Sequence, residues 1–401
     1  MHKAYKYRIY PTKEQEITLI NWLGQTRYVW NKFLEQNIAR YKLEKKFIFK
    51  YDLNKQLPGM KKELDWLNAP AHALQAVGLQ FDLALKNCYK SKMGFPKYKC
   101  KNKSNTGIKI SQVNPKTPHI ILNRKTIKIP KLGLVKLIKH REAEGRLLNI
   151  TITRDVDQWY VSCLHEIDNQ VQPKPIYSEQ DIIGLDLGLK SFAVTSDAEI
   201  IANPKLSKQY EKKLAKKQQQ FSKKQKGSNN RNKARIQVAK LYRKIRFKRK
   251  DFLHKISSQI ANENSVVIVE DLNVKGMMSN HKLAKAIHDA SWSQFVGYLS
   301  YKLQWTGGQL MKIGRFEPSS KTCSSCGHVQ DIKLSQRTFI CESCDFSCDR
   351  DLNAAFNIKA LGLKKLNKSG TGLIYACGDT TIGDELGLSR FVSAKQEAAI
   401  L

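Results

Sequence analysis

The chain has 401 residues, and 70 Lys and Arg against 35 Asp and Glu give it a formal net charge of +35, which favours nucleic acid as a polyanionic partner. A hydrophobic content of 41% can fill real cores and excludes a chain that is disordered throughout. Because no apolar run reaches the roughly 18 residues of a membrane-spanning helix and the first residues lack a signal peptide's apolar centre, we expect a cytoplasmic protein with no membrane partner.

The N-terminal part of the sequence predicts a small β domain that a helical lobe interrupts. Residues 1–10 alternate like a strand, and apolar residues such as Ile17 then recur at helical spacing. Further along, the segment LLNITITRDVDQWYVSCLHEI alternates apolar and polar residues, as paired strands do. We therefore expect a small β-barrel or sheet from residues 1–10 and 95–180, a helical lobe from residues 11–94, and a linker at 171–180.

A second domain is expected over residues 181–365. Within it, residues 204–264 are strongly basic and helical in pattern, with one break at GSNN (227–230), which predicts a helical hairpin. Its cations outnumber its acids too heavily for i,i+4 pairs to neutralise them. A solvated helical face is one interpretation, and a surface that follows a phosphate backbone is the one we favour. The candidate phosphate contacts are Lys212, Lys216, Arg231, Arg235, Arg243 and Arg246.

Two strand-like segments of the second domain carry acids. In DIIGLDLGLKSFAV, alternation puts Asp186 on the same face as Gly184, which leaves room for a backbone or a phosphate to approach. The run SVVIVEDLNV is rich in β-branched residues, as a strand covered on both faces is, and it ends in Glu270 and Asp271. An acid at a strand end is often only a turn or cap residue, so neither segment is decisive alone.

A third acid comes from DRDLNAAFNI, which predicts the start of a helix. Asp351 shares a helical stripe with Ala354 and Ile358, whereas Asp349 is better placed as the helix cap. Three carboxylates in one partly apolar site would repel one another unless divalent cations held them, and oxygen ligands select Mg²⁺ or Mn²⁺. Two such ions about 4 Å apart can hydrolyse a phosphodiester. The predicted catalytic metal ligands are Asp186, Glu270 and Asp351.

Two Cys-x-x-Cys pairs lie close together in the sequence, and they predict a zinc ribbon over residues 318–348. The short hairpin between the pairs has too little core to fold without the metal. Cys348 lies outside the pair spacing, and the isolated cysteines, Cys377 among them, are expected to be ordinary small hydrophobes. The predicted Zn²⁺ ligands are Cys323, Cys326, Cys341 and Cys344.

Taken with these motifs, the chain resembles the TnpB proteins, the OrfB-type transposases of bacterial insertion sequences that are related to type V CRISPR effector nucleases. The resemblance rests on KYRIYPTKEQ, GLDLGLKSFA, VIVEDLNVKGM, EPSSKTCSSCG, CDRDLNAAFNI and, more weakly, ACGD. It implies an RNA-guided endonuclease that cuts double-stranded DNA selected by pairing to a guide RNA from the transposon end. It also places the family's catalytic acids on the three predicted carboxylates and its zinc ligands on the four paired cysteines.

The resulting fold class is α/β with all-β and helical lobes, in which an RNase H-like (RuvC) domain with a zinc-ribbon insert follows the β-barrel. Tyr51, Gln75 and Gln80 are candidate base contacts, since Gln can make paired hydrogen bonds to adenine. Residues 366–401 are Gly-rich and are expected to form a loosely held tail. Two alternatives stay open, a transposase that performs strand transfer and a guided repressor that binds DNA without cutting it. The sequence leaves the guide, the target-adjacent motif and the oligomeric state undefined.

Overall fold

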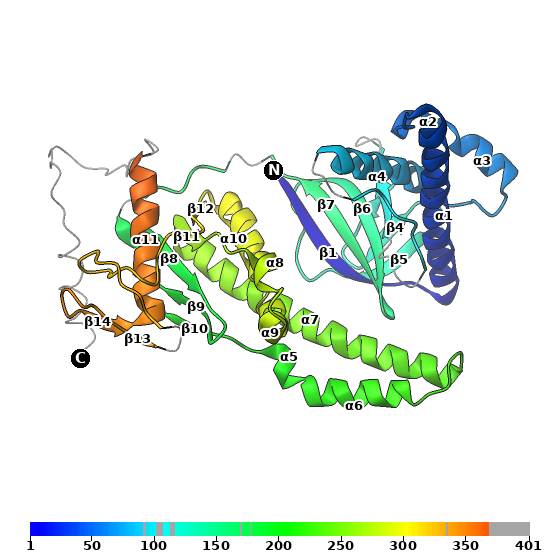
Figure 1. Ribbon diagram of the computed structural model, residues 1–401. Coiled ribbons are helices and arrows are strands. Elements are labelled where there is room, and N and C mark those ends of the chain that lie inside the picture. Colours follow the sequence, from blue (N-terminus) through cyan, green and yellow to red (C-terminus); the bar gives the residue numbers. More distant parts are fainter. Residues whose placement is uncertain are drawn as a thin grey trace. The chain divides into compact units, whose positions relative to one another are not determined.

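The computed structural model divides into two compact units, Met1–Gln170 and Val171–Leu401 (Figure 1). The residues that the structure describes are 1–90, 94–101, 107–112, 117–168, 171–176, 178–333 and 336–368. Within these ranges, no helix combines the length and the apolar character that crossing a membrane requires.

The first unit is built on one antiparallel sheet of seven strands in the order β2-β6-β7-β1-β5-β4-β3. The predicted first strand, β1, lies in the middle of it and pairs with β7 on one side and β5 on the other. Its alternate side chains Tyr5, Tyr7 and Ile9 are buried. The strands are β1 (His2–Tyr10), β2 (Gly107–Ser111), β3 (Ile121–Leu122), β4 (Thr126–Ile129), β5 (Gly133–Ile138), β6 (Arg146–Asp155) and β7 (Gln158–Glu166). Closure of this sheet into a barrel stays a prediction.

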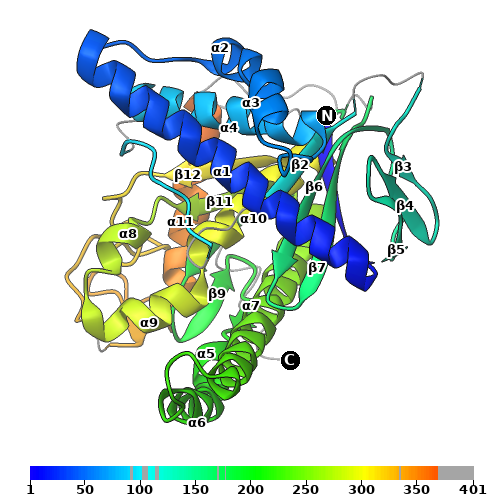
Figure 2. The same cartoon turned by 90° about the vertical axis from the view of Figure 1, so that its right-hand side faces the viewer.

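Helices occupy the sequence between β1 and β2, and Figure 2 shows α1 and α4 beside one another. Thr12 caps α1 through a capping box with Gln15, in which each side chain accepts from the other residue's backbone N–H. The helix that this spacing predicts is present, but Ile17 is 60% exposed on it while Leu19 and Trp22 face the core. The helices are α1 (Lys13–Glu44), α2 (Lys50–Lys55), α3 (Leu57–Glu63) and α4 (Ala71–Lys90).

The second unit is built on a five-stranded sheet in the order β10-β9-β8-β11-β12. Strand β11 pairs in parallel with β8 and β12, whereas β9 and β10 continue the sheet as antiparallel strands. The strands are β8 (Ile182–Leu187), β9 (Ser191–Thr195), β10 (Ile200–Ala202), β11 (Val266–Glu270) and β12 (Gln309–Ile313). A separate hairpin joins β13 (Thr338–Ile340) to β14 (Ser347–Asp349).

Two layers of helix cover this sheet because both of its faces are apolar. Ile183 and Leu185 pack with α7 and α10 on one face, while Ile182 and Ile268 pack with α11 on the other. This arrangement confirms the predicted alternation along β8 and the burial of β11. The helices are α5 (Leu206–Gln209), α6 (Glu211–Ser222), α7 (Asn229–Glu263), α8 (Val274–Met277), α9 (His281–Ala290), α10 (Trp292–Thr306) and α11 (Arg350–Lys368), with a short 3₁₀ turn at Glu179–Asp181.

Three predicted boundaries can be compared with the structure. A helical hairpin is present, because α6 and α7 run side by side (Figure 1) and are joined near Gly227.

The segment expected to be a linker, residues 171–180, makes hydrogen bonds to the second unit. The Lys174 N–H donates to the Gly307 carbonyl (2.8 Å), and the Ser265 hydroxyl donates to the Pro175 carbonyl (2.8 Å). At the other end, α11 continues to Lys368, so the first residues of the expected tail are helical. The rest of that tail, including Cys377, lies outside the described residues.

Candidate catalytic and metal-binding sites

Asp186 and Glu270 are brought together by two neighbouring parallel strands. In the register of β8 and β11, Gly184 lies opposite Ile268 and Leu185 opposite Val269. Glu270 is the next residue of β11, so it lies beside Asp186 where both strands end. Because side chains alternate along a strand, Asp186 and Glu270 share the sheet face that α11 covers.

Helix α11 adds the third acid because Gly184 lets it approach β8 closely. A Cβ atom on residue 184 would lie 2.5 Å from the carbonyl oxygen of Ala355 and 2.7 Å from the backbone nitrogen of Lys359. Asp351 is one helical turn before Ala355, and Asp186 is two residues after Gly184 on the same strand face. The same packing that needs the glycine therefore directs Asp351 toward Asp186.

The electrostatics of Asp186 reflect this convergence. Burial, followed by the carboxylates of Glu270 and Asp351, raises the pKa of Asp186 to about 7, and Arg350 opposes the shift. Glu270 and Asp351 are near enough to disfavour the ionised form of Asp186, although the three carboxylates are not as tightly grouped as the four cysteines. A divalent cation would offset this repulsion, and carboxylate oxygens are ligands of the kind that Mg²⁺ and Mn²⁺ prefer.

Asp349 and Asp271 have other roles, although both are next to predicted ligands. The Asp349 side chain accepts from the backbone N–H groups of Asp351 (2.9 Å) and Leu352 (3.3 Å), which confirms the prediction that it caps the helix. Asp271 is bound by Arg315 (2.7 Å) and by Lys312 (3.3 Å), and these partners lower its pKa. Neither acid is therefore needed to explain the carboxylate site.

Ser319 and Asn357 support this site, and sequence reasoning missed both. The buried Ser319 hydroxyl donates to Glu270 Oε1 (2.5 Å), and Asn357 Nδ2 donates to the carbonyl oxygens of Ser319 (2.8 Å) and Thr322 (2.6 Å). Asn353, one turn earlier, donates to the same Thr322 carbonyl (2.7 Å). Two buried asparagines four residues apart on an otherwise apolar stripe are the signal that could have found this contact.

The four paired cysteines converge on one point. Cys323 and Cys344 Sγ atoms are 3.7 Å apart, Cys326 and Cys341 Sγ atoms are 3.6 Å apart, and all four lie within 4.8 Å of one another. Four sulfur atoms at roughly 2.3 Å from one tetrahedral zinc ion would be about 3.8 Å apart. The spacing therefore fits a structural zinc site, and no other group of three or more potential metal ligands of this compactness occurs among the described residues.

Each cysteine pair is presented by the same kind of turn. After Cys326, Gly327 has a φ of 79°, and after Cys344, Asp345 has a φ of 54°. The Gly327 N–H donates to the Cys323 carbonyl (3.0 Å), as the Asp345 N–H does to the Cys341 carbonyl (3.1 Å). These turns leave the sulfur atoms of both pairs free to face one ion.

Cys348 stands apart from this cluster. Its thiol donates to the Asp349 carbonyl (3.4 Å), and burial raises its pKa to about 11, so the thiol is protonated at neutral pH. Cys163 is fully buried in the first sheet, as expected of a small hydrophobe.

The candidate phosphate contacts of the hairpin fall into two groups. Lys212, Lys216 and Arg235 are exposed. Arg231 is half-buried, lies 4.4 Å over the Phe221 ring and donates to the Lys224 carbonyl (2.6 Å), so its guanidinium closes the α6–α7 turn. Arg243 is half-buried, and the exposed Arg246 lies against the Phe247 ring.

The candidate base contacts lie on the helical part of the first unit. Tyr51, on α2, is 73% exposed and has Lys50 over its ring. Gln75 is exposed on α4 with its side chain next to His72 (3.3 Å), whereas Gln80 is half-buried. Their role in reading bases stays a prediction.

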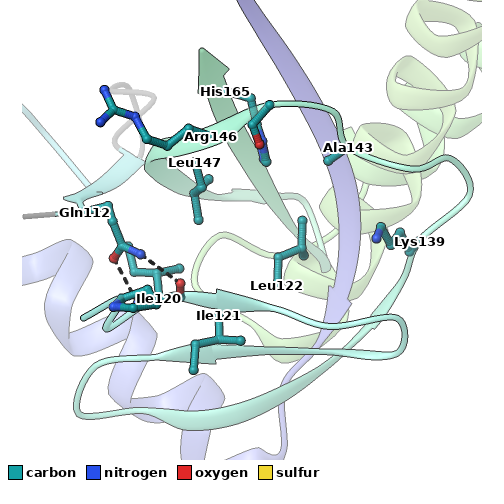
Figure 3. Close-up of a pocket in the computed structure, with 11 residues that line it drawn as sticks. Gln112, Ile120, Ile121, Leu122, Lys139, Ala143, Arg146, Leu147 and His165 are labelled. Carbon is teal, nitrogen blue, oxygen red and sulfur yellow. Dashed lines mark hydrogen bonds between the residues drawn. The ribbon is translucent and has the colours of Figure 1, made fainter. Parts of the chain in front are cut away.

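A pocket of about 340 Å³ lies in the first unit (Figure 3). Gln112 fixes one side of it by bonding both the N–H (3.0 Å) and the carbonyl (3.1 Å) of Ile120. His165, Leu122 and Leu147 line other parts of its wall. The described residues around it include no carboxylate, so it does not compete with the acidic site as a centre for metal-assisted hydrolysis.

Family models match three parts of the chain. The OrfB model, described as a probable transposase, matches residues 164–281, and a Cas12f1-like TNB domain matches residues 292–358. An associated model described as a helix-turn-helix domain matches residues 1–46, where the structure has a strand followed by one continuous helix, α1. These matches define a protein of the OrfB class.

Two relatives and one solved structure are similar along nearly the whole chain. A protein of Streptomyces pristinaespiralis is 34% identical over 390 residues, covering 94% of this chain and 91% of that protein. InsQ of Escherichia coli K12 is 27% identical over 401 residues, with 94% of each covered. Both are named "putative RNA-guided DNA endonuclease". The chain belongs to the TnpB family. Its fold is similar to the protein in a Cas12f1–sgRNA–target DNA complex, at 16% identity and a TM-score of 0.56, over 90% of this chain and 98% of that one.

Proposed function

We propose that this protein is an RNA-guided endonuclease that cuts double-stranded DNA at the site formed by Asp186, Glu270 and Asp351. The convergence of these three acids from β8, β11 and α11 is the observation that carries the proposal. The family supports the choice of substrate, since two of its members carry this activity in their names. The net charge of +35 suits a protein that holds two nucleic-acid strands along its surface.

The three carboxylates would hold Mg²⁺ or Mn²⁺. When bound, two such ions supply an activated water and stabilise the leaving 3′ oxygen of the cut strand. The protein's own residues position the ligands: Gly184 lets α11 reach β8, and Ser319 orients Glu270 by donating to its Oε1. Asp349 starts α11 and so fixes the backbone on which Asp351 is held.

The second unit then corresponds to an RNase H-like (RuvC) domain. Its support is the sheet, in which parallel strands β8, β11 and β12 are extended at the β8 edge by antiparallel β9 and β10. The four cysteines would bind structural Zn²⁺ in a ribbon that Asn353 and Asn357 join to α11. The first unit would be the part that holds guide RNA and reads the sequence beside the target, as the resemblance implies.

The proposal is tested with the protein purified from its host together with the RNA that it carries. Sequencing that RNA defines the guide, and a DNA duplex with the matching sequence is then incubated with Mg²⁺. We expect linear cut ends from the wild-type complex, and we expect Asp186→Ala and Glu270→Ala to abolish cutting while DNA affinity stays nearly unchanged. Cutting by both variants would refute the assignment of the site.

The same reaction separates the two alternatives. A strand-transfer transposase would give joined products in place of cut ends. A repressor would bind the duplex tightly and leave it intact in both Mg²⁺ and Mn²⁺. The influence of Glu270 and Asp351 on Asp186 supports an enzyme over a repressor, and the names of the relatives support cleavage over strand transfer.

A further inference from the structure

Phe316 is the most exposed large apolar side chain among the described residues, with 93% of its surface open to solvent. It lies in the segment Gly314–Ser319, which joins β12 to the cysteine-containing part of the chain. A single exposed apolar residue is ordinary on a protein surface. The surroundings of the ring, and not its exposure alone, are what point to a ligand.

The segment that carries Phe316 is fixed on both sides of the ring. On one side, Arg315 Nη2 donates to the Asp271 carboxylate (2.7 Å), and Arg315 Nε donates to the backbone carbonyl of Asp271 (3.3 Å). On the other side, the Ser319 hydroxyl donates to the Glu270 carboxylate (2.5 Å), and the Ser319 backbone N–H donates to the Glu317 carbonyl (2.8 Å). The ring is therefore held outward from a short loop whose two ends are bound to consecutive acids, Glu270 and Asp271.

These anchors place the ring close to the proposed metal site. Consecutive Cα atoms are about 3.8 Å apart, so the Cα atoms of Phe316 and Ser319 are separated by at most about 11 Å. Ser319 touches Glu270 directly. Since stacked nucleotides of one strand are about 3.4 Å apart, a base on this ring would be only a few nucleotides from a phosphate at the carboxylates.

The charges near the ring suit a phosphate backbone. Lys312 and Arg315 are about half exposed while they pair with Asp271, so this acid does not present an isolated negative charge. Pro318 and Ser319 turn the chain back toward the ribbon, as the N–H groups of Lys321 and Thr322 both donate to the Pro318 carbonyl (3.0 Å). Within residues 314–319, Glu317 is the one acid that a DNA strand approaching the ring would meet.

We infer that Phe316 is a stacking surface for an unpaired base of the DNA strand that enters the carboxylate site. Aromatic side chains bind bases of any identity through their π faces, and this interaction does not depend on sequence. The ring would hold the strand in register with the acids, as a positioning residue that does not touch the reacting phosphate. This inference rests on the proposed function, which supplies the DNA strand as substrate.

The test compares Phe316→Ala, Phe316→Trp and Leu43→Ala in the purified protein–RNA complex. Leu43 is 84% exposed on α1, so its variant controls for loss of an exposed apolar side chain in the other unit. The probe is a short single-stranded DNA with 2-aminopurine at successive positions, whose fluorescence falls when the base stacks. It is bound without added Mg²⁺ or Mn²⁺, so that no cleavage is required.

We expect quenched fluorescence at one or two adjacent positions in the wild type, loss of quenching and a roughly 5- to 100-fold weaker affinity in Phe316→Ala, and recovery in Phe316→Trp. Leu43→Ala should match the wild type. Quenching and affinity that are the same in Phe316→Ala and wild type would overturn the inference. So would unchanged DNA binding accompanied by faster proteolysis of residues 369–401, which would assign the ring to the chain's own C-terminal segment.

These measurements test the nuclease function and the stacking surface independently. If the wild-type complex cuts no DNA but quenching depends on Phe316, the stacking surface stands and the proposed nuclease function falls. If the wild type cuts its target and Phe316→Ala cuts it with unchanged KM and kcat and unchanged quenching, the function stands and the stacking surface falls.

Discussion

Gly184 and the backbone of Ala355 are in such close contact that a Cβ atom at residue 184 would lie 2.5 Å from the Ala355 carbonyl oxygen. Backbone atoms cannot rotate away as a flexible side chain can, so α11 would have to move. Because Asp351 is one turn before Ala355, that movement would carry it away from Asp186. A glycine that bears no functional group is therefore a determinant of the carboxylate site.

We predict that Gly184→Ala lowers the free energy of unfolding by about 1–3 kcal/mol, as overpacked core positions do, and abolishes DNA cleavage. Denaturant unfolding and a cleavage assay measure the two effects. Gly297→Ala is the matched control, since Gly297 is exposed within α10 and has no atom within 4 Å of the added Cβ. It should be more stable than wild type by about 0.5–1 kcal/mol and fully active. Normal cleavage by Gly184→Ala would show that the position of α11 is not critical.

The sequence predicted the parts of this site that depend on local pattern. Alternation along β8 separated Asp186 from Leu185, and helix periodicity placed Asp349 as the cap of α11, both of which the structure shows. The contacts of Ser319 and Asn357 were missed because their partners, Glu270 and Ser319, lie far away in the chain. A polar side chain in a sequence does not reveal which distant carbonyl or carboxylate it will meet.

In the first unit, too, local sequence pattern predicts the elements but not their partners. Strand alternation predicted β1, whereas the central place of β1 between β7 and β5 depends on pairing with residues that follow the whole helical part. The exposure of Ile17 was also not predictable from spacing alone, since the buried stripe of α1 is set by which helix face meets its neighbours. Local periodicity indicates an element, and tertiary packing decides its orientation.

The raised pKa of Asp186 predicts how stability depends on pH in the absence of divalent cations. An acid whose pKa rises from 3.8 to about 7 on folding binds more protons in the folded state, so stability should fall as pH increases from about 4 to 7 and stay low above that. Without added divalent cations at pH 8, Asp186→Asn should therefore be more stable than wild type, by up to roughly 4 kcal/mol. Thermal unfolding of both proteins at pH 6 and pH 8 checks this expectation.

Magnesium should change that comparison because protons and cations compete for the same carboxylate. Adding Mg²⁺ should raise the thermal midpoint of the wild type more at pH 8 than at pH 6, and it should leave Asp186→Asn nearly unchanged. An equal rise at both pH values in both proteins would mean that the cation binds elsewhere.

Zinc should be needed to hold the ribbon together. We predict that Cys341→Ser loses bound zinc and that its ribbon is cleaved rapidly by protease, since the hairpin β13–β14 has only a small cluster around Phe339 as its own core. Cys348→Ser is the control, because this thiol donates to the Asp349 carbonyl and lies outside the four-sulfur cluster. It should keep one zinc ion per chain by elemental analysis. Full zinc content in Cys341→Ser would contradict the assignment.

The Ser319 hydroxyl should matter for metal binding through Glu270. Ser319→Ala removes the donor at 2.5 Å from Glu270 Oε1, and loss of such outer contacts typically weakens metal affinity or activity by about 10- to 100-fold. Titrating Mg²⁺ in a cleavage assay should show this as a higher half-saturating concentration. Ser324→Ala is the matched control, since the Ser324 hydroxyl is buried without a hydrogen-bond partner among the described residues. An identical Mg²⁺ requirement in the two variants would exclude the proposed contact.

The α6–α7 hairpin should bind nucleic acid through its exposed cations. We predict that replacing Lys212, Lys216 and Arg235 together with Ala weakens RNA or DNA binding and makes it less dependent on salt, because each lost phosphate contact removes about 0.7–0.9 from the slope of log K against log salt. Arg231→Ala also removes a positive charge, but the Arg231 guanidinium donates to the Lys224 carbonyl (2.6 Å). It should loosen the turn and leave the salt slope unchanged. Equal slopes for the triple variant and the wild type, measured between 50 and about 200 mM salt, would show that this surface is only a solvated helical face.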